Sequence, residues 1–126
     1  MRILVIDDDT DILEIISKIL RIEDYKVIIA SNGKEGLQII KSTPEIYLVI
    51  IDLIMPEKEG IETIREIKED FPHIKTVAMS GGGRYGSNNY LSLAKFLGAD
   101  LTLKKPFGTE ELLKSVKKLT VEKKTI

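Results

Sequence analysis

Tyr47-Leu48-Val49-Ile50-Ile51-Asp52 is the stretch that decides the fold. Its apolar residues follow one another without the polar alternation of a strand that has one face in water. Such a run is typical of a strand covered by helices on both faces of a parallel sheet. The run ends in an acid, and ligands of open α/β folds bind at the carboxyl ends of the strands.

Four further apolar runs of strand length extend this pattern along the chain. They are residues 3–6, 27–30, 76–79 and 101–103. Apolar residues at helical spacing lie between these runs and after the last one. The first such set is Ile12, Ile15, Ile16, Ile19 and Leu20. We therefore predict an α/β fold of five βα units, doubly wound around a five-stranded parallel sheet in the flavodoxin-like strand order 2-1-3-4-5.

A single domain accounts for almost the whole chain. We expect a folded domain over residues 1–120 and a short, frayed tail over residues 121–126. The chain has 126 residues, a size that fits one domain. We expect the three phenylalanines to pack in the core. They are Phe71, Phe96 and Phe107.

The composition argues against several classes of protein. Hydrophobic residues make up 43% of the chain and charged residues 31%, a mixture that disfavours disorder. The formal net charge of -1 gives no global attraction to nucleic acid or to an anionic membrane. The chain has no cysteine and one histidine, which excludes a zinc ribbon and a site built on a pair of histidines. No apolar run approaches the roughly 20 residues of a membrane span, so we expect a cytoplasmic protein.

Polar residues that can carry chemistry follow four of the five predicted strands. Asp7 and Asp8 follow the first strand, Asp52 the third, Ser80 the fourth and Lys105 the fifth. The carboxyl ends of parallel strands share one edge of the sheet, and the first and third strands are neighbours in the predicted order. We therefore expect the carboxylates of Asp7, Asp8 and Asp52 to meet.

Three carboxylates at one place need a cation or a proton. Two charges about 4 Å apart repel by about 4 kcal/mol at an effective dielectric constant of about 20. Mg²⁺ prefers oxygen ligands and often joins carboxylates to a phosphate, whereas Ca²⁺ is a weaker candidate here. An aspartate can also attack phosphorus when cations neutralise the phosphoryl oxygens. Asp52 and Lys105 fit the nucleophile and the neutralising ammonium group.

Each of these residues also has an ordinary structural explanation. Residues 7–9 could cap the first helix, Asp52 could open a turn, Ser80 could bind its own loop, and Lys105 could be a surface cation. A shared functional role is favoured over these separate explanations because all of these residues fall at one edge of the predicted sheet.

The sequence resembles the receiver domain of response regulators, the CheY-like phosphoacceptor unit of two-component signalling. Residues 3–9, Ile-Leu-Val-Ile-Asp-Asp-Asp, resemble the opening strand and acidic pair of that family. Residues 49–56, Val-Ile-Ile-Asp-Leu-Ile-Met-Pro, resemble its phosphoacceptor strand and loop. Gly98-Ala99-Asp100 and Lys105-Pro106-Phe107 resemble its closing motifs.

The resemblance implies a role for each site residue. Asp52 would accept the phosphoryl group, and Asp7, Asp8 and Asp52 would bind Mg²⁺ together with the backbone carbonyl of Ile54. Ser80 and Lys105 would bind the phosphoryl oxygens. The Lys105–Pro106 peptide bond is expected to be cis.

The resemblance also implies the partners. The phosphoryl donor would be a phosphohistidine on a sensor histidine kinase or on a histidine phosphotransfer protein. The domain would catalyse its own phosphorylation and slow dephosphorylation, acting as a signalling switch that binds an output protein or domain. We expect it to bind neither nucleic acid nor a membrane directly. The sequence identifies neither the kinase nor the output.

Two features depart from the family pattern. Thr102 occupies a position where the family usually has Tyr or Phe, so the aromatic half of the family's switch is missing. The loop over residues 81–89 is about three residues longer than usual and rich in glycine, which permits mobility.

Three alternatives follow from the same residues. Gly81, Gly83 and Gly86 spell G-x-G-x-x-G, but the acid that should bind a ribose, Asp100, precedes a strand instead of ending one. A haloacid-dehalogenase phosphatase would match D-x-D at residues 7–9, but Asp11 and the short chain do not fit that family. A receiver fold that serves only as a binding scaffold is supported by Thr102.

Overall fold

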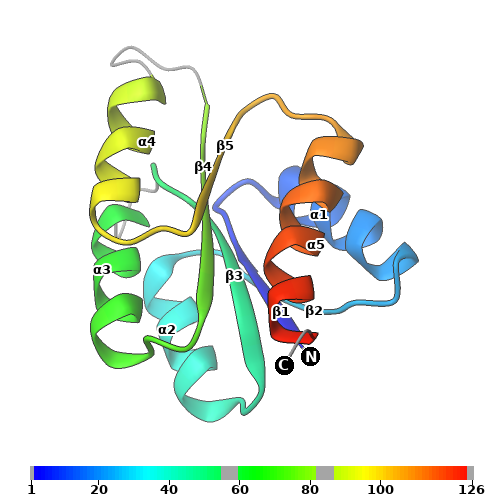
Figure 1. Cartoon of the computed structure of the whole chain (residues 1–126), viewed down its shortest axis with the longest axis horizontal. Helices are drawn as coiled ribbons and strands as arrows, with labels where there is room; N and C mark the ends of the chain where they lie inside the picture. Colours follow the sequence, from blue (N-terminus) through cyan, green and yellow to red (C-terminus); the bar gives the residue numbers. More distant parts are fainter. Residues whose placement is uncertain (1, 55–59, 82–86, 125–126) are drawn as a thin grey trace.

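Within the residues that the structure describes, five parallel strands form the central sheet, in the order β2-β1-β3-β4-β5 (Figure 1). A computed structural model describes residues 2–54, 60–81 and 87–124, the last with backbone alone at 87–91 and 121–124. The strands are β1 (Arg2–Ile6), β2 (Lys26–Ala30), β3 (Ile46–Asp52), β4 (Lys75–Ser80) and β5 (Leu101–Lys104). The predicted α/β fold class and strand order are confirmed.

Five helices in the described part of the chain cover both faces of the sheet (Figure 1). They are α1 (Thr10–Ile22), α2 (Gly33–Ser42), α3 (Gly60–Asp70), α4 (Ser87–Phe96) and α5 (Thr109–Lys124). Helices α1 and α5 lie on one face, and α2, α3 and α4 lie on the other. Residues 121–124 continue α5, and residues 125–126 lie outside the described residues. The predicted domain limits, 1–120 and 121–126, stay a prediction.

Strand β3 is buried along its whole length, as its unbroken apolar run predicts. Alternate residues serve two core clusters, one on each face of the sheet. Val49 and Ile51 belong to the cluster beneath α2, α3 and α4, and Leu48 and Ile50 belong to the cluster beneath α1 and α5. Because both faces of this strand are covered, its carboxyl end is the part that can reach solvent.

Helix α1 starts at an aspartate cap just beyond β1. Asp9 Oδ1 accepts hydrogen bonds from the backbone nitrogens of Asp11 (2.9 Å) and Ile12 (3.4 Å). These bonds satisfy donors that a helix leaves free in its first turn. Asp9 is thus the acid of residues 7–9 that caps the helix, which leaves the other two for the sheet edge.

The prediction for the phenylalanines is wrong for one of the three. Phe71 and Phe107 are half-buried and pack against the two core clusters. Phe96 is 86% exposed. Helix α4 turns Ala94 to the core, and a side chain two residues farther along a helix points about 200° away from it.

Within the described residues, none of the helices joins the length and the apolar character that crossing a membrane requires.

Asp100 ties three elements together at the amino edge of the sheet. Its Oδ2 accepts hydrogen bonds from the backbone nitrogen of Thr76 in β4 (2.8 Å) and from Nζ of Lys68 in α3 (2.9 Å). Its own backbone nitrogen donates to the carbonyl oxygen of Thr76 (2.9 Å). Asp100 therefore lies at the end of β5 opposite Lys105, which agrees with rejecting it as a ribose-binding acid. Gly83 and Gly86 of the same motif lie outside the described residues.

We expect Asp100→Ala to lower the free energy of unfolding by about 1–3 kcal/mol, because a backbone donor and a part-buried ammonium group lose their acceptor. Urea denaturation at neutral pH measures this loss. Asp70→Ala removes an exposed carboxylate from the end of α3 and should change stability by less than about 0.5 kcal/mol. Equal effects of the two substitutions would contradict a stabilising role for the Asp100 contacts.

Candidate functional site

The residues predicted from the strand ends converge at the carboxyl edge of the sheet. Asp7 follows β1, Asp52 is the last residue of β3, Ser80 is the last residue of β4, and Lys105 follows β5. Asp7, Asp52 and Ser80 are buried, whereas Asp8 is exposed. The site therefore combines three buried polar residues with one acidic side chain, that of Asp8, which is exposed to solvent.

Asp7, Asp8 and Asp52 form a cluster of three carboxylates. One oxygen from each lies within 4.8 Å of the others. The expectation that these three side chains meet is confirmed. Asp7 is also held from its own loop, because its Oδ1 accepts a hydrogen bond from the backbone nitrogen of Asp9 (3.0 Å).

Lys105 inserts its ammonium group between two of these acids. Its Nζ lies 2.8 Å from Asp7 Oδ2 and 3.3 Å from Asp52 Oδ1. The backbone nitrogen of Lys105 donates to the carbonyl oxygen of Ser80 (2.8 Å), which fixes where the side chain leaves β5. The Lys105–Pro106 bond is cis, as the family resemblance implies.

The surroundings of Asp52 raise the pKa of its carboxyl group. Burial raises the pKa of Asp52 to about 6; Lys105 lowers it, while the nearby charges of Asp7 and Asp8 raise it further. For Lys105, burial lowers the pKa, but the hydrogen bond to Asp7 and the charge of Asp52 outweigh burial and raise it overall. Lys105 is therefore a permanent cation at neutral pH.

Ser80 ends β4 at the site, but within the part of the chain that the structure describes its hydroxyl group makes no hydrogen bond to the three acids. Its hydroxyl group is buried and donates to the carbonyl oxygen of Gly81 (3.3 Å). This is the local hydrogen bond that the structural explanation of Ser80 predicts. A hydroxyl group can rotate to another acceptor, so the bond leaves Ser80 free to serve a ligand.

Thr102 occupies the position where the family pattern has an aromatic ring. It is half-buried in β5 and pairs with Ala78 of β4. Ser80 follows Ala78 by two residues, on the same face of the sheet. Thr102, Ala78 and Ser80 therefore place small side chains next to one another on the α4 face of the sheet.

Gly60, a residue that apolar patterning does not single out, shapes the site. A Cβ atom at this first residue of α3 would lie 2.6 Å from Leu53 Cα and would also overlap the backbone carbonyl of Asp52. The backbone nitrogen of Gly60 donates to the carbonyl oxygen of Leu53 (3.0 Å). Only glycine allows α3 to start this close to the end of β3. A glycine at the start of an apolar helical pattern was the signal available in the sequence.

The loop between β3 and α3 is described in part. Ile54 follows Asp52 by two residues, and its side chain is 46% exposed. Residues 55–59, which include Met55 and Pro56 of the motif, lie outside the described residues.

The cluster of acids fits Mg²⁺ by its chemistry. Its donors are all carboxylate oxygens, the ligand type that hard divalent cations prefer, and they are close enough together to share one ion. Three carboxylates face one ammonium group here, which leaves a surplus of negative charge, and burial, with smaller contributions from the charges of Asp7 and Asp8, raises the pKa of Asp52. A cation in contact with the acids would relieve that surplus.

The chain is similar to known signalling proteins. A family model described as the response regulator receiver domain matches residues 3–117. A homolog of the transcriptional regulatory protein CpxR from Haemophilus influenzae is 35% identical over 116 residues, which cover 92% of this chain and 48% of that protein. The response regulator SaeR from Staphylococcus aureus is 30% identical over 98% of this chain and 52% of its own length. The chain thus spans about half the length of these curated relatives.

Solved structures of single receiver domains match over nearly their whole length. A receiver domain protein from Clostridium thermocellum has a TM-score of 0.88 and 35% identity, covering 98% of this chain and 96% of that one. A CheY-like receiver domain protein from Methanospirillum hungatei has a TM-score of 0.87 and 34% identity at the same coverage.

We expect Asp52→Asn to raise the free energy of unfolding by about 1–3 kcal/mol at pH 7.5 in a chelator, because it removes a buried charge among like charges. The folded-state pKa, about 6, exceeds the unfolded value of 3.8. Protonated Asp52 therefore favours folding below about pH 4, and this contribution is lost as the pH rises through 6. The stability gap between variant and wild type should accordingly shrink from pH 7.5 to pH 4.

Urea denaturation at several pH values measures this gap. Asp70→Asn is the matched control, since it makes the same chemical change at an exposed position. An Asp52→Asn variant that is less stable than the wild type at pH 7.5 would contradict an unfavourable burial of the Asp52 charge.

Proposed function

Because the chain belongs to the response regulator receiver domain family, we propose that it is a phosphoacceptor switch in which Asp52 receives a phosphoryl group from a phosphohistidine. The observation that carries this proposal is the joint contact of Lys105 Nζ with Asp7 and Asp52, beside a third carboxylate. Such an arrangement of two buried acids and one ammonium group at a solvent-facing edge is suited to binding a phosphoryl group.

Asp52 is the nucleophile of this proposal. A carboxylate oxygen of Asp52 attacks phosphorus, an O–P bond forms, and the P–N bond to the donor imidazole breaks with its electron pair left on nitrogen. The raised pKa of Asp52 supports this role, since a more basic carboxylate is a better nucleophile provided that it is ionised. In the slow return reaction, water attacks phosphorus, and the O–P bond to Asp52 breaks to release inorganic phosphate.

The other residues of the site neutralise charge. Lys105 lies 3.3 Å from Asp52 Oδ1, within reach of an oxygen on a phosphoryl group attached there. The Ser80 hydroxyl can turn from Gly81 to donate to another phosphoryl oxygen. Asp7, Asp8, Asp52 and the backbone carbonyl of Ile54 would hold Mg²⁺. The ion, when bound, would offset the negative charge of the acids and of the phosphoryl oxygens.

The partners follow from the same proposal. The donor is a sensor histidine kinase or a histidine phosphotransfer protein, and the phosphorylated domain binds an output protein or domain. The two curated relatives described above are a transcriptional regulatory protein and a response regulator, each about twice as long as this chain. Cytoplasmic location and the lack of direct nucleic-acid and membrane binding stay predictions of the sequence.

A binding scaffold that is never phosphorylated is the second candidate. It is favoured by Thr102, which offers no aromatic ring to respond to Ser80. The two candidates differ in whether Asp52 takes up phosphate.

Treatment with acetyl phosphate and Mg²⁺ should add one phosphoryl group to the wild type, as read from the intact mass. Asp52→Asn should add none, because an amide cannot form the acyl phosphate. Replacing Mg²⁺ with a chelator should abolish the mass change. Asp70→Asn should be phosphorylated like the wild type. Phosphate on the Asp52→Asn protein would identify another acceptor, and an unchanged wild type would favour the scaffold.

We expect Lys105→Ala to slow phosphorylation by about 100-fold, since it removes the cation that faces the transferring oxygens. The rate is measured from the intact mass over time, at a temperature well below the unfolding midpoint. Lys104→Ala, an exposed neighbour in β5, is the control and should keep the wild-type rate. If Lys105→Ala lost thermal stability but kept its phosphorylation rate, Lys105 would be a structural residue only.

A further inference from the structure

The loop between β1 and α1 carries two acids of the cluster and the cap of a helix. Asp7 and Asp8 belong to the cluster of carboxylates, and Asp9 is the N-cap of α1. Asp9 is exposed and stands outside the three acids whose oxygens lie within 4.8 Å of one another. It is linked to the cluster through its backbone, because its N–H group donates to Asp7 Oδ1 (3.0 Å).

Hydrogen bonds from the helix hold Asp9 in one conformation. Its Oδ1 accepts from the backbone nitrogens of Asp11 (2.9 Å) and Ile12 (3.4 Å). Its carbonyl oxygen accepts from the backbone nitrogen of Leu13 (3.1 Å). The backbone of Asp9 is extended, with φ -91° and ψ 109°, as is typical of an N-cap residue. The side chain of Asp9 therefore ties the direction of its own N–H group to the first turn of α1.

The carboxylate of Asp7 depends on that N–H group. Asp7 is 1% exposed, so its oxygens need donors within the protein. Lys105 Nζ lies 2.8 Å from Oδ2, and the backbone nitrogen of Asp9 donates to Oδ1. The backbone of Asp7 is fixed separately, because its nitrogen donates to the carbonyl oxygen of Ala30 in β2 (3.1 Å). The two donors to the side chain thus set the rotation of the Asp7 carboxylate.

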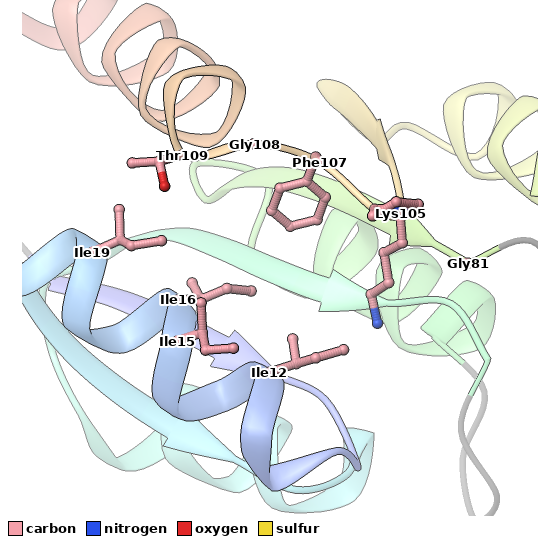
Figure 2. Close-up of a pocket in the computed structure, with 10 residues that line it drawn as sticks. Ile12, Ile15, Ile16, Ile19, Gly81, Lys105, Phe107, Gly108 and Thr109 are labelled. Carbon is pink, nitrogen blue, oxygen red and sulfur yellow. The ribbon is translucent and has the colours of Figure 1, made fainter.

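The two donors to Asp7 come from different elements. Figure 2 shows Lys105 at the end of β5, with its ammonium group directed toward the end of α1 at which Ile12 lies. The nitrogen of Asp9 belongs instead to the loop that opens α1. If the first turn of α1 loosened, Lys105 alone of these two donors would be left, and the Asp7 carboxylate could turn both oxygens toward it. Asp8 would move as well, since it stands between Asp7 and Asp9 in the same loop.

We propose that Asp9 is a positioning residue of the metal site. By capping α1, its side chain holds the N–H group that orients Asp7 and the loop that presents Asp8. A divalent cation then finds both carboxylates already in place beside Asp52. The inference rests on the proposed function, in which these three acids hold Mg²⁺, and it adds a residue that does not itself contact the ion. Removing a group that orients a metal ligand typically weakens metal binding by roughly 10- to 100-fold.

Helix α2 supplies a matched control. Asn32 follows β2 at the same edge of the sheet and caps α2, because its Oδ1 accepts a hydrogen bond from the backbone nitrogen of Glu35 (2.8 Å). Its carbonyl oxygen accepts from the backbone nitrogen of Gly36 (3.0 Å). Among the described residues, these bonds of Asn32 all lead into its own helix and none leads to the three acids. Loss of either cap should therefore lower the thermal unfolding midpoint by a similar amount, and only loss of the Asp9 cap should affect the acids.

Titration of Mg²⁺ into isotope-labelled protein, followed by NMR of the backbone amides, tests the proposal without a phosphoryl donor. Asp9→Ala should weaken Mg²⁺ binding about tenfold, because the capping oxygen is lost. Asp9→Asn removes the same charge but keeps an oxygen that can cap, so its affinity should stay within about threefold of the wild type. Asn32→Ala should bind Mg²⁺ like the wild type.

Asp9→Gly is a second variant without a capping oxygen. Glycine is tolerated at an N-cap with little loss of stability, so this protein stays folded if Asp9→Ala does not. It should also weaken Mg²⁺ binding, because the N–H group of residue 9 is no longer tied to the first turn of α1.

Equal Mg²⁺ affinities of the alanine or glycine variant and of Asp9→Asn would overturn the proposal. A loss of affinity in Asn32→Ala as large as that in Asp9→Ala would overturn it too, since the effect would then follow from stability in general. A wild type that does not bind Mg²⁺ would overturn it together with the metal site. If the wild type binds Mg²⁺ but gains no mass from acetyl phosphate, the phosphoacceptor function fails, whereas the expected order of Mg²⁺ affinities would still support the role of Asp9.

Discussion

Lys105 Nζ reaches across the carboxyl edge of the sheet to two buried acids, Asp7 at 2.8 Å and Asp52 at 3.3 Å. These acids end neighbouring strands, so the register of β1 against β3 forces them together. Burial and the charges of Asp7 and Asp8 disfavour the ionisation of Asp52 and raise its pKa, and the ammonium group of Lys105 is the nearby charge that favours it. The same contact therefore offsets part of the negative charge that the strands bring to the carboxyl edge.

Backbone contacts set the position of each partner in this arrangement. The backbone nitrogen of Lys105 donates a hydrogen bond to the carbonyl oxygen of Ser80 in β4. The backbone nitrogen of Leu53 donates one to the carbonyl oxygen of Met79 in the same strand. Hydrogen bonds to β4 thus position the chain next to Asp52 on one side and Lys105 on the other. The missing Cβ of Gly60 lets α3 begin directly against the end of β3. Asp52 is consequently held by neighbours on both sides.

Strand order and the cluster of acids could be predicted because both follow from apolar runs and from the residues that end them. A run such as residues 48–51 marks a strand covered on both faces, and parallel strands necessarily bring their carboxyl ends to one edge. The contacts within the cluster could not be predicted, because they depend on side-chain reach. Local geometry decides that Lys105 pairs most closely with Asp7. It also decides that the Ser80 hydroxyl group donates its hydrogen bond to the carbonyl oxygen of Gly81.

The sequence also did not predict which apolar residues of the helices are exposed to solvent. Periodicity locates Ile15 and Phe96 among apolar residues, but it does not say how wide a face the sheet can cover. In α1 the sheet covers Leu13, Ile16 and Leu20, and a second row of isoleucines is left over. Close approaches of backbone, such as that of Gly60 to the end of β3, leave no trace in apolar patterning either.

Asp100 anchors α3, β4 and β5 at the amino edge, a full strand length away from Lys105. The contacts that hold these elements together and the cluster of acids are thereby divided between opposite edges of one sheet. Substitutions around Asp52 can therefore change the chemistry of the carboxyl edge without touching the contacts of Asp100. A fold divided in this way can diversify into many specificities from a single ancestral frame.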